Sequence, residues 1–424
     1  MEIDQADGNR LQTIVVDLTP VRPGGENGGA KVFVLELIRR LGELAPQTEF
    51  VLLTQRAAHD ELAALDSHNI RRLVTVDRAS LPAVLPLGGR LFSAIQRRLP
   101  NRLRGFAGQF RYRLVSALKT RRTGGLLQSL KADLLFCPFT APTYFDPAVP
   151  TVSTVYDFQY KAYPAFFEPE DVASRNRTFV EAARKATHLV AISDYTRLTA
   201  IKDEKVDADR ISTIHLHVAE LSRNAESRDD GVLDRLGLVA NRYLIYPANF
   251  WKHKNHEMLL AALGIARHDG LDSTIRLVCT GAPGARQEFL ARAARDLGLE
   301  DRVIFPGFIH EAELWALITH SAGVIFSSLY EGFGLPVIEA LAAGVPVACS
   351  NVTSLPEVAG DAAILFDPRR PEQVAAAMRA LIEDRELAAR LVAAGKARAA
   401  LFSDSRAMAR QYWEIFERVT GPRQ

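Results

Sequence analysis

The chain has 424 residues, of which 48% are hydrophobic and 24% are charged, and its formal net charge is +2. A single hydrophobic core stops growing near roughly 250–300 residues, so this length predicts two domains. The composition excludes disordered, fibrous and repeat chains, and the near-balanced charge alone gives no reason to expect nucleic-acid binding.

Cysteine usage and the N-terminus indicate the compartment. Cys137, Cys279 and Cys349 lie far apart in apolar surroundings without C-x-x-C spacing, so we expect three small core residues in a reducing compartment. The first five residues, MEIDQ, are acidic and polar, and no stretch of about 18 apolar residues occurs. These features predict a cytoplasmic protein without a membrane-spanning segment.

In the first half, short β-branched runs alternate with helical patterns. A helix is expected through Val32, Leu35, Ile38 and Leu41, after a glycine-rich loop. Strands are predicted at residues 13–16, 50–53, 134–137, 151–155 and 189–192. This alternation predicts a doubly wound α/β domain with a parallel sheet, assigned to residues 1–220.

The alternation restarts after residues 220–230, a polar stretch typical of an interdomain linker. Strands are predicted at residues 243–246, 275–279, 303–305, 324–327, 345–348 and 363–366, and helices at 257–265, 287–297, 336–343 and 371–391. We therefore expect a second domain of the same class over residues 221–403. Residues 404–424 have apolar side chains at helical spacing and predict a closing helix, for which packing back on the first domain is one arrangement.

The strongest functional pattern is EGFGLPVIE at residues 331–339. Its glycines allow the backbone to approach a ligand, Pro336 suits a first helical turn, and the free N–H groups of that turn attract an anion. Glu331 can accept hydrogen bonds from sugar hydroxyls, and Glu339, about two turns into the helix, from ribose hydroxyls. A helix start with an acidic residue near its dipole is the alternative interpretation.

Together with this string, AGVPV at 343–347 and PEVAGDAA at 356–363 resemble retaining glycosyltransferases of family 4. The resemblance continues through DRVIFPGF at 301–308 and YPANFWKHKN at 246–255, and it covers the second half and parts of the first. It implies the GT-B fold, in which two Rossmann-like domains face a central cleft and the C-terminal domain holds most of the donor. The periodicity agrees with that fold but does not distinguish it from other two-sheet architectures.

The resemblance assigns Lys254 to the donor diphosphate, which gains negative charge as the nucleotide leaves, so no metal is required. His253 and Asn249 stand near where many relatives have an arginine, so the diphosphate has fewer contacts here or another basic side chain supplies them. The other donor-binding residues that the resemblance implies are Gly281, Phe308, Glu331, Gly332, Phe333, Gly334, Leu335 and Glu339. Alternatively, Lys254 is a surface lysine, and Gly281 and Phe308 are a turn glycine and a core aromatic.

Two features of the first half belong to the same expected cleft. GGENGGA at residues 24–30 lies where a phosphate-cradling loop belongs, and the resemblance assigns Gly28 and Gly29 to the cleft wall, with a plain turn as the alternative. Tyr156 and Asp157 end a predicted strand, and relatives usually have a histidine at the position of Tyr156. A phenol with a pKa of about 10 is a poor base, so Asp157 is the candidate for an acid–base role. A turn-forming aspartate is the alternative.

A basic amphipathic region covers residues 90–122, which contain no Asp or Glu. Such segments bind anionic membranes, with about 1 kcal/mol per cation near the headgroups. The alternative is a solvated face of helices. We expect no nucleic-acid partner, because no base-reading motif accompanies the charge. His188, His215 and His217 lie in apolar segments and are expected to be structural, and no metal-ligand spacing occurs.

These patterns predict a retaining glycosyltransferase that uses a nucleotide-sugar donor, with GDP-mannose as the candidate, and no cofactor or metal. YDFQYKAYPAFF at residues 156–167 looks similar to mannosyltransferases of surface-polysaccharide and lipopolysaccharide assembly. The expected acceptor is a glycan or a lipid-linked glycan at the inner face of the membrane. The alternatives are a glucan enzyme resembling glycogen synthase or phosphorylase, and a catalytically weak sugar-nucleotide-binding protein.

Overall fold

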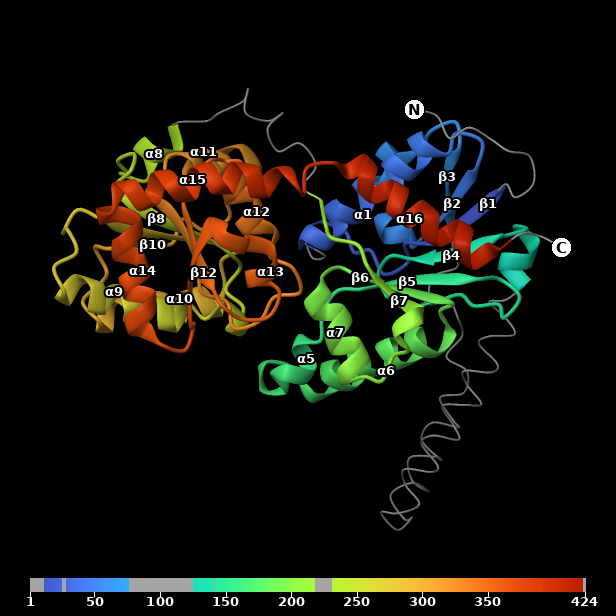
Figure 1. The fold of residues 1–424 in the computed structure, drawn as a ribbon, viewed down its shortest axis with the longest axis horizontal. Coiled ribbons are helices and arrows are strands. Elements are labelled where there is room, and N and C mark those ends of the chain that lie inside the picture. The colour runs from blue at the N-terminus through green and yellow to red at the C-terminus, as the bar shows by residue number, and fades with distance from the viewer. Residues whose placement is uncertain (1–10, 25–27, 76–124, 141, 218–230, 422–424) are drawn as a thin grey trace, which may run out of the picture.

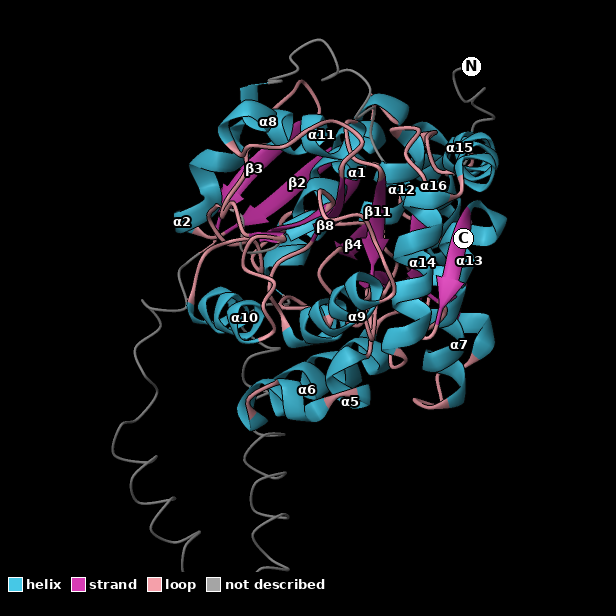
Figure 2. Ribbon diagram, turned by 90° about the vertical axis from the view of Figure 1, so that its left-hand side faces the viewer, coloured by secondary structure: helices cyan, strands magenta, loops and turns pink. Residues whose placement is uncertain are grey.

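The computed structural model describes residues 11–24, 28–75, 125–140, 142–217 and 231–421. They build two parallel β-sheets with helices packed around them (Figures 1 and 2). The basic region 90–122 and the expected linker 220–230 lie outside the described residues. The predicted fold class, two doubly wound α/β domains, is confirmed.

The first sheet has the strand order β3-β2-β1-β4-β5-β6-β7. Its strands are β1 (Thr13–Asp17), β2 (Glu49–Thr54), β3 (Ile70–Val74), β4 (Leu134–Cys137), β5 (Thr151–Val155), β6 (His188–Ala191) and β7 (Ile211–Thr213). The central strands are continuous buried runs, as parallel strands covered on both faces must be. The strand order reverses between β1 and β4, so the loops leaving their carboxyl ends border a crevice.

The helices of this domain are α1 (Gly28–Leu44), α2 (Arg56–His59), α5 (Gln159–Ala162), α6 (Pro169–Lys185) and α7 (Asp194–Lys202), with short 3-10 turns at Asp60–Leu65, Pro164–Phe166 and Ala208–Arg210. The helix predicted through Val32, Leu35, Ile38 and Leu41 is α1, although Val32 itself is 67% exposed. Val34, Leu37, Ile38 and Leu41 face the core instead. Their i, i+3, i+4, i+7 spacing follows the helical period more closely than a strict spacing of three.

The second sheet has the order β10-β9-β8-β11-β12-β13 and reverses between β8 and β11. Its strands are β8 (Tyr243–Pro247), β9 (Arg276–Thr280), β10 (Val303–Ile304), β11 (Gly323–Phe326), β12 (Val347–Ser350) and β13 (Ala363–Phe366). Around it lie α8 (Gly231–Arg235), η5 (Lys252–Lys254), α9 (His256–His268), α10 (Ala285–Asp296), α11 (Glu311–Thr319), α12 (Leu335–Ala342), α13 (Leu355–Ala359), η6 (Gly360–Ala362), α14 (Pro371–Glu383) and α15 (Arg385–Ala400).

The helix predicted over residues 371–391 is two helices, so that expectation was wrong. Asp384 separates α14 from α15, and its Oδ1 accepts a hydrogen bond from the N–H of Leu387, 2.9 Å away. A side chain that satisfies a free N–H group at a helix start stabilises the break.

The last helix, α16 (Ser405–Thr420), lies beside α1 of the first domain (Figure 1). Tyr412 and Phe416 pack on the ring of Phe136, and the hydroxyl groups of Tyr412 and Thr154 are 3.2 Å apart. The chain therefore crosses from the first domain to the second and returns.

Two smaller predictions also have outcomes. The three cysteines are buried and free, as expected. Within the described ranges, no helix combines the length and apolar character that crossing a membrane requires.

Candidate active site

Lys254 and Glu331 come from the loops that leave β8 and β11, the two neighbouring strands at which the order of the second sheet reverses. In open α/β sheets, ligands bind at this position. Lys254 Nζ donates to Glu331 Oε1 at 2.6 Å, and the two side chains are only 10% and 13% exposed. The structure therefore brings together a predicted cation and a predicted acid in a shielded pair. The interpretation of Lys254 as a surface lysine is wrong.

The backbone of Lys254 is fixed from both strands. The Tyr246 hydroxyl donates to the carbonyl oxygen of Lys254 at 2.7 Å, and Ser327 Oγ donates to the same oxygen at 3.3 Å. Asn255 ends η5 in the left-handed conformation, and its amide donates to the carbonyl of Ser327. The ammonium group lies 4.9 Å from the centre of the Phe326 ring. These contacts hold the charge at the β11 turn before any ligand arrives.

The turn that carries Glu331 is held from the neighbouring loop. The N–H of Glu331 donates to Thr353 Oγ1 at 3.1 Å, and Ser354 Oγ donates to the carbonyls of Glu331 and Phe333 at 3.0 and 2.9 Å. Gly334 precedes α12 with φ 114°, and a Cβ there would lie 2.6 Å from a methyl group of Leu355. Only glycine meets both demands at position 334.

Asp157 reaches this turn from the first domain, where it follows β5. A Cβ on Gly332 would overlap the carbonyl oxygen of Tyr156 and lie 3.1 Å from the Cβ of Asp157. Burial raises the pKa of the Asp157 carboxyl, and the Glu331 carboxylate acts in the same direction. Asp157 Oδ1 also accepts from the N–H of Gln159 at 2.9 Å, as a turn-forming aspartate does. Asp157 thus forms a turn and also lies against the Glu331 turn.

Tyr156, which stands where relatives usually have a histidine, uses its hydroxyl in the first domain. The hydroxyl donates to the carbonyl of Pro138 at 2.8 Å, and the ring stacks on Phe139 at a centroid distance of 6.4 Å. Burial raises the pKa of this phenol well above its usual value. Tyr156 is therefore not available as a base, which leaves Asp157 as the candidate at this strand end.

The starts of two helices meet across the domains. Gly28 and Gly29 begin α1, and a Cβ on Gly29 would lie 3.1 Å from Leu335 Cδ1 at the start of α12. The first N–H groups of a helix have no partner within it, and the helix dipole favours negative charge there. Two such helix starts that face each other suit an anion such as a diphosphate. Residues 25–27 of the glycine-rich loop lie outside the described residues.

Gly281 and Phe308 lie on loops after β9 and β10. The N–H of Gly281 donates to the carbonyl of Gly307 at 3.3 Å, and a Cβ on Gly281 would lie 3.0 Å from the carbonyl of Ala248. Phe308 is 69% exposed, so its interpretation as a core aromatic is wrong. Asn249, in the loop after β8, accepts a hydrogen bond at Oδ1 from the N–H of Ala282 at 3.1 Å and thus joins that loop to the loop after β9.

Burial changes the charge expected at pH 7 for two residues of the second domain, His253 and Glu339. Burial lowers the pKa of His253 to about 4, so this histidine is neutral at pH 7 and adds no positive charge for a diphosphate. Burial raises the pKa of Glu339 on α12 to about 7, and Glu311 contributes in the same direction. Among the described residues, none donates a hydrogen bond to the Glu339 carboxyl.

The histidines have different environments. His188 Nε2 is 2.9 Å from Ser212 Oγ, as expected for a structural histidine. His217 differs from that expectation, because its Nδ1 is buried without a partner in the described part of the chain. His215 follows β7, and its Nε2 lies 2.6 Å from Glu357 Oε1 on α13 of the second domain.

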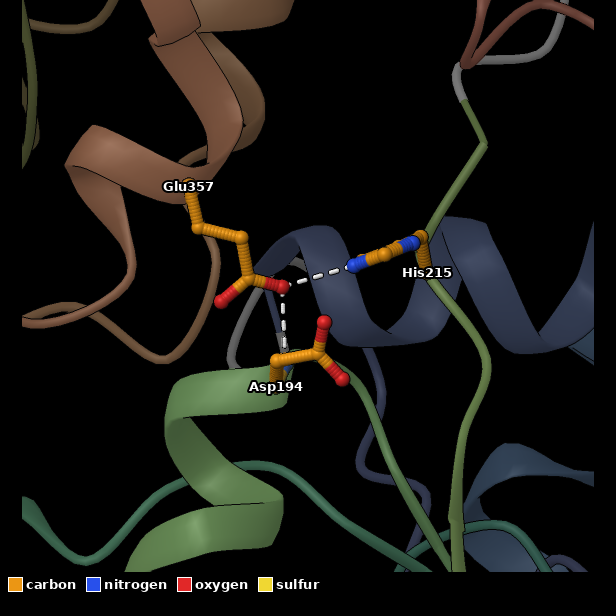
Figure 3. Close-up of side chains that lie close together, drawn as sticks. All are labelled: Asp194, His215 and Glu357. Atoms are coloured by element: carbon orange, nitrogen blue, oxygen red, sulfur yellow. Dashed lines mark hydrogen bonds and ion pairs between the residues drawn. The ribbon is translucent and has the colours of Figure 1, made fainter.

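Sequence reasoning missed the cluster that His215 forms. One ligand atom each of Asp194, His215 and Glu357 lies within 4.8 Å of the others, a spacing that could hold a metal ion (Figure 3). The Glu357 oxygens already accept from the N–H groups of Asp194 and Tyr195 as well as from His215. The carboxylate is therefore satisfied by protein donors. That the reaction needs no metal stays a prediction.

Residues 238–398 match the family profile of glycosyl transferases group 1. The second half thus carries a group 1 glycosyltransferase domain. This match includes all the predicted donor-binding residues of the second domain, from Lys254 to Glu339.

Two relatives by sequence and one solved structure extend the comparison. The chain is 29% identical to the O-antigen chain mannosyltransferase B of Escherichia coli, over 69% of this chain and 75% of that protein. It is 28% identical to a D-inositol 3-phosphate glycosyltransferase of Thermobispora bispora, over 97% and 96% of the two chains. The crystal structure of Anabaena HepE in complex with UDP and glucose has a TM-score of 0.68 at 17% identity, covering 95% of this chain and 99% of HepE. These matches indicate a glycosyltransferase with the GT-B fold.

Proposed function

We propose that this glycosyltransferase is a retaining hexosyltransferase of family 4 type that transfers a sugar from a nucleotide-diphosphate donor. The observation that carries the proposal is the shielded Lys254–Glu331 pair at the crevice of the second sheet, with Asp157 of the first domain packed against the same turn. A cation and the carboxyl groups of Glu331 and Asp157 lie together there, and Glu339 follows on the helix that this turn begins. Such a site recognises a diphosphate with sugar rings on both sides.

Each group has a task in this proposal. Lys254 and the starts of α1 and α12 bind the diphosphate and stabilise the charge that grows on it as the bond to the sugar breaks. Lys254 then exchanges Glu331 for a phosphate oxygen, which frees the Glu331 carboxylate to accept hydrogen bonds from the sugar hydroxyls. Glu339 accepts from the ribose, and Phe308 offers an exposed ring near the base. The leaving phosphate assists removal of the acceptor proton, with Asp157 in the same wall of the cleft.

The proposed donor is GDP-mannose, and the proposed pathway is surface-polysaccharide assembly. The support is the similarity to the O-antigen chain mannosyltransferase B of Escherichia coli. Because HepE was crystallised with UDP and glucose, the competing donor class is a UDP-sugar. No metal ion takes part in the proposed reaction.

The proposed acceptor is a glycan or lipid-linked glycan at the inner face of the membrane. Its support is the run of Lys and Arg without Asp or Glu in residues 90–122, because each cation near anionic headgroups contributes about 1 kcal/mol. Co-sedimentation with phosphatidylglycerol vesicles at low but not high salt, and no binding to RNA, is the expected result. Equal recovery with neutral vesicles would contradict membrane contact through the positive charge of this region.

A donor panel tests the function directly. Thermal unfolding is measured with GDP-mannose, UDP-glucose and ADP-glucose, since a ligand at 100 times its dissociation constant adds about 2.7 kcal/mol to stability. The best stabiliser is then used with a glycan acceptor, and NMR of the product decides whether the anomeric configuration is retained. Transfer from ADP-glucose to maltooligosaccharides would establish the glucan alternative, and binding without transfer would establish a sugar-nucleotide-binding protein.

The same assay tests the site. Lys254→Ala and Glu331→Ala are each expected to lower turnover at least about tenfold, which corresponds to about 1.4 kcal/mol of transition-state stabilisation. Turnover at the wild-type rate in both variants would show that the assignment of the site is wrong.

A further inference from the structure

The carboxylate of Glu357 joins the two domains. Glu357 lies on α13 of the second domain, and its oxygens accept hydrogen bonds from the N–H groups of Asp194 and Tyr195, at 2.7 and 3.0 Å. These residues form the first turn of α7 in the first domain. Glu357 thus supplies a second acceptor for the start of that helix, beside its own N-cap Ser193. A carboxylate at a helix start is bound both by hydrogen bonds and by the helix dipole.

His215 completes this contact from a third segment. Its Nε2 is 2.6 Å from Glu357 Oε1, and Figure 3 shows the carboxylate between the imidazole and the start of α7. The imidazole ring packs against Phe333 and Phe402, at centroid distances of 5.9 and 5.7 Å. His215 lies just after β7, where the chain leaves the first sheet. The same carboxylate therefore binds the first domain at two places.

On its own side, α13 is tied to the donor-binding turn. Ser354, directly before α13, donates to the carbonyl oxygens of Glu331 and Phe333, and Thr353 accepts from the N–H of Glu331. The guanidinium of Arg398 on α15 donates to the carbonyls of Glu357 and Val358 and holds α13 against its own domain. Because these hydrogen bonds connect α13 to the Glu331 turn, a displacement of Glu357 should also displace that turn.

On the other side, α7 is tied to the strand end that carries Asp157. Thr196 Oγ1 lies 3.2 Å from the carbonyl oxygen of Tyr156 and 3.5 Å from that of Gly332. The first turn of α7 is therefore hydrogen-bonded to Tyr156, the residue before Asp157. The contacts form a closed ring from Asp157 through α7, Glu357 and α13 to the Glu331 turn.

We propose that Glu357 is a positioning residue that holds the two domains closed by capping α7, and thereby sets the place of Asp157 against the Glu331 turn. The proposal rests on the proposed function for its effect on turnover, but the closed arrangement itself is independent of any activity. Most of the predicted donor contacts, among them Lys254 and Glu339, lie on the second domain, and only the start of α1 comes from the first. Loss of the cap should therefore impair the chemical step far more than nucleotide binding.

The test compares Glu357→Ala with Glu357→Gln and with a matched control, Glu372→Gln. Glu372 is an exposed acid in the first turn of α14, and Glu372→Gln removes one negative charge from the second domain without changing Glu357. Small-angle scattering of the full chain without donor is expected to give a larger radius of gyration for Glu357→Ala. Its kcat is expected to fall at least about tenfold, with a nucleotide dissociation constant within about threefold of wild type. Glu357→Gln keeps one acceptor for α7 and should be intermediate, and Glu372→Gln should match wild type.

A second variant keeps the test decisive if Glu357→Ala does not fold. Thr196→Val removes the link between α7 and Tyr156 without touching Glu357, and it should show the same separation of kcat from nucleotide affinity. Wild-type dimensions and wild-type kcat in Glu357→Ala would overturn the proposal, as would a nucleotide affinity that falls as much as kcat. If the wild-type chain transfers no sugar from any donor, the proposed function fails while the scattering comparison still decides whether Glu357 closes the domains.

Discussion

Replacing Lys254 by methionine removes one partner of an ion pair that the protein shields from water on both sides. The pair is 2.6 Å long, with side chains 10% and 13% exposed, so the Glu331 carboxylate would be left without its cation in a site of low solvent access. Removing one partner of a buried pair costs about 3–5 kcal/mol. We expect the lower end, about 3 kcal/mol, because both side chains keep some contact with water. Methionine keeps the apolar stem beside Phe326, so packing is largely preserved.

Calorimetry of the ligand-free protein measures this cost. For domains of 150–250 residues a loss of 1 kcal/mol lowers Tm by roughly 2–4 °C, so Lys254→Met is expected to lower the Tm of the second domain by roughly 6–12 °C. Combining it with Glu331→Gln removes both charges, and the double variant should recover about 1–3 kcal/mol relative to the sum of the single variants. Addition of the nucleotide diphosphate should stabilise wild type but not Lys254→Met, because the ammonium group that binds phosphate is gone.

Strict additivity of the two single variants would refute the coupling between the two charges. A wild-type Tm together with a full response to nucleotide in Lys254→Met would refute both the buried pair and the diphosphate site. A Tm loss with an unchanged nucleotide response would leave Lys254 as a structural residue only.

Other predictions concern the contact between the domains at Gly332, the titration of Glu339 and the absence of a metal requirement. Gly332→Ala places a methyl group on the carbonyl of Tyr156, so turnover should fall at least about tenfold while nucleotide binding by equilibrium dialysis stays within about threefold. Because burial raises the pKa of Glu339 from 4.5 to about 7, its contribution to folding is complete below 4.5 and is lost as pH rises through 7. Glu339→Gln should flatten that part of the stability–pH curve in calorimetry, and an unchanged curve would assign it to another group. Transfer activity should survive EDTA, and its loss with recovery on added Mn²⁺ or Mg²⁺ would show a metal-dependent reaction.

The sequence predicts most strands of this fold within one or two residues, for a physical reason. A parallel strand covered on both faces is a continuous apolar run, as in β4, and such runs are visible without knowledge of the fold. The edge strand β3 was missed because its sequence IRRLV carries two arginines that an edge tolerates. The three-residue β7 was missed because it is too short to show a period. The break at Asp384 was missed because no glycine or proline marks it.

The site was predictable only where its residues are neighbours in sequence or in a known motif. The string EGFGLPVIE contains Glu331, the glycine turn and Glu339, and the family resemblance adds Lys254. Neither can show that Gly332 touches the end of β5, because that contact depends on how the two domains are placed. The Glu357 cluster joins residues from positions 194, 215 and 357, and no local pattern connects them. The charge of His253 could not be predicted from its residue type either, because it is burial that lowers the pKa of this histidine and makes it neutral at pH 7.

The division of contacts between the domains implies a division of effects. Most of the candidate donor contacts, among them Lys254, Glu331 and Glu339, belong to the second domain, so donor binding depends on the first domain mainly through the start of α1. In the arrangement that the structure shows, Asp157 lies against the Glu331 turn of the second domain. Gly332, Tyr330 and Glu357 are among the second-domain residues that contact the first domain, and the Tyr330 hydroxyl accepts from the N–H of Phe158 at 3.3 Å. A closed cleft excludes water from the reacting sugar, and it also blocks exchange of donor and product. Substitutions within the second domain should therefore change affinity first, whereas substitutions at the contact should change turnover first.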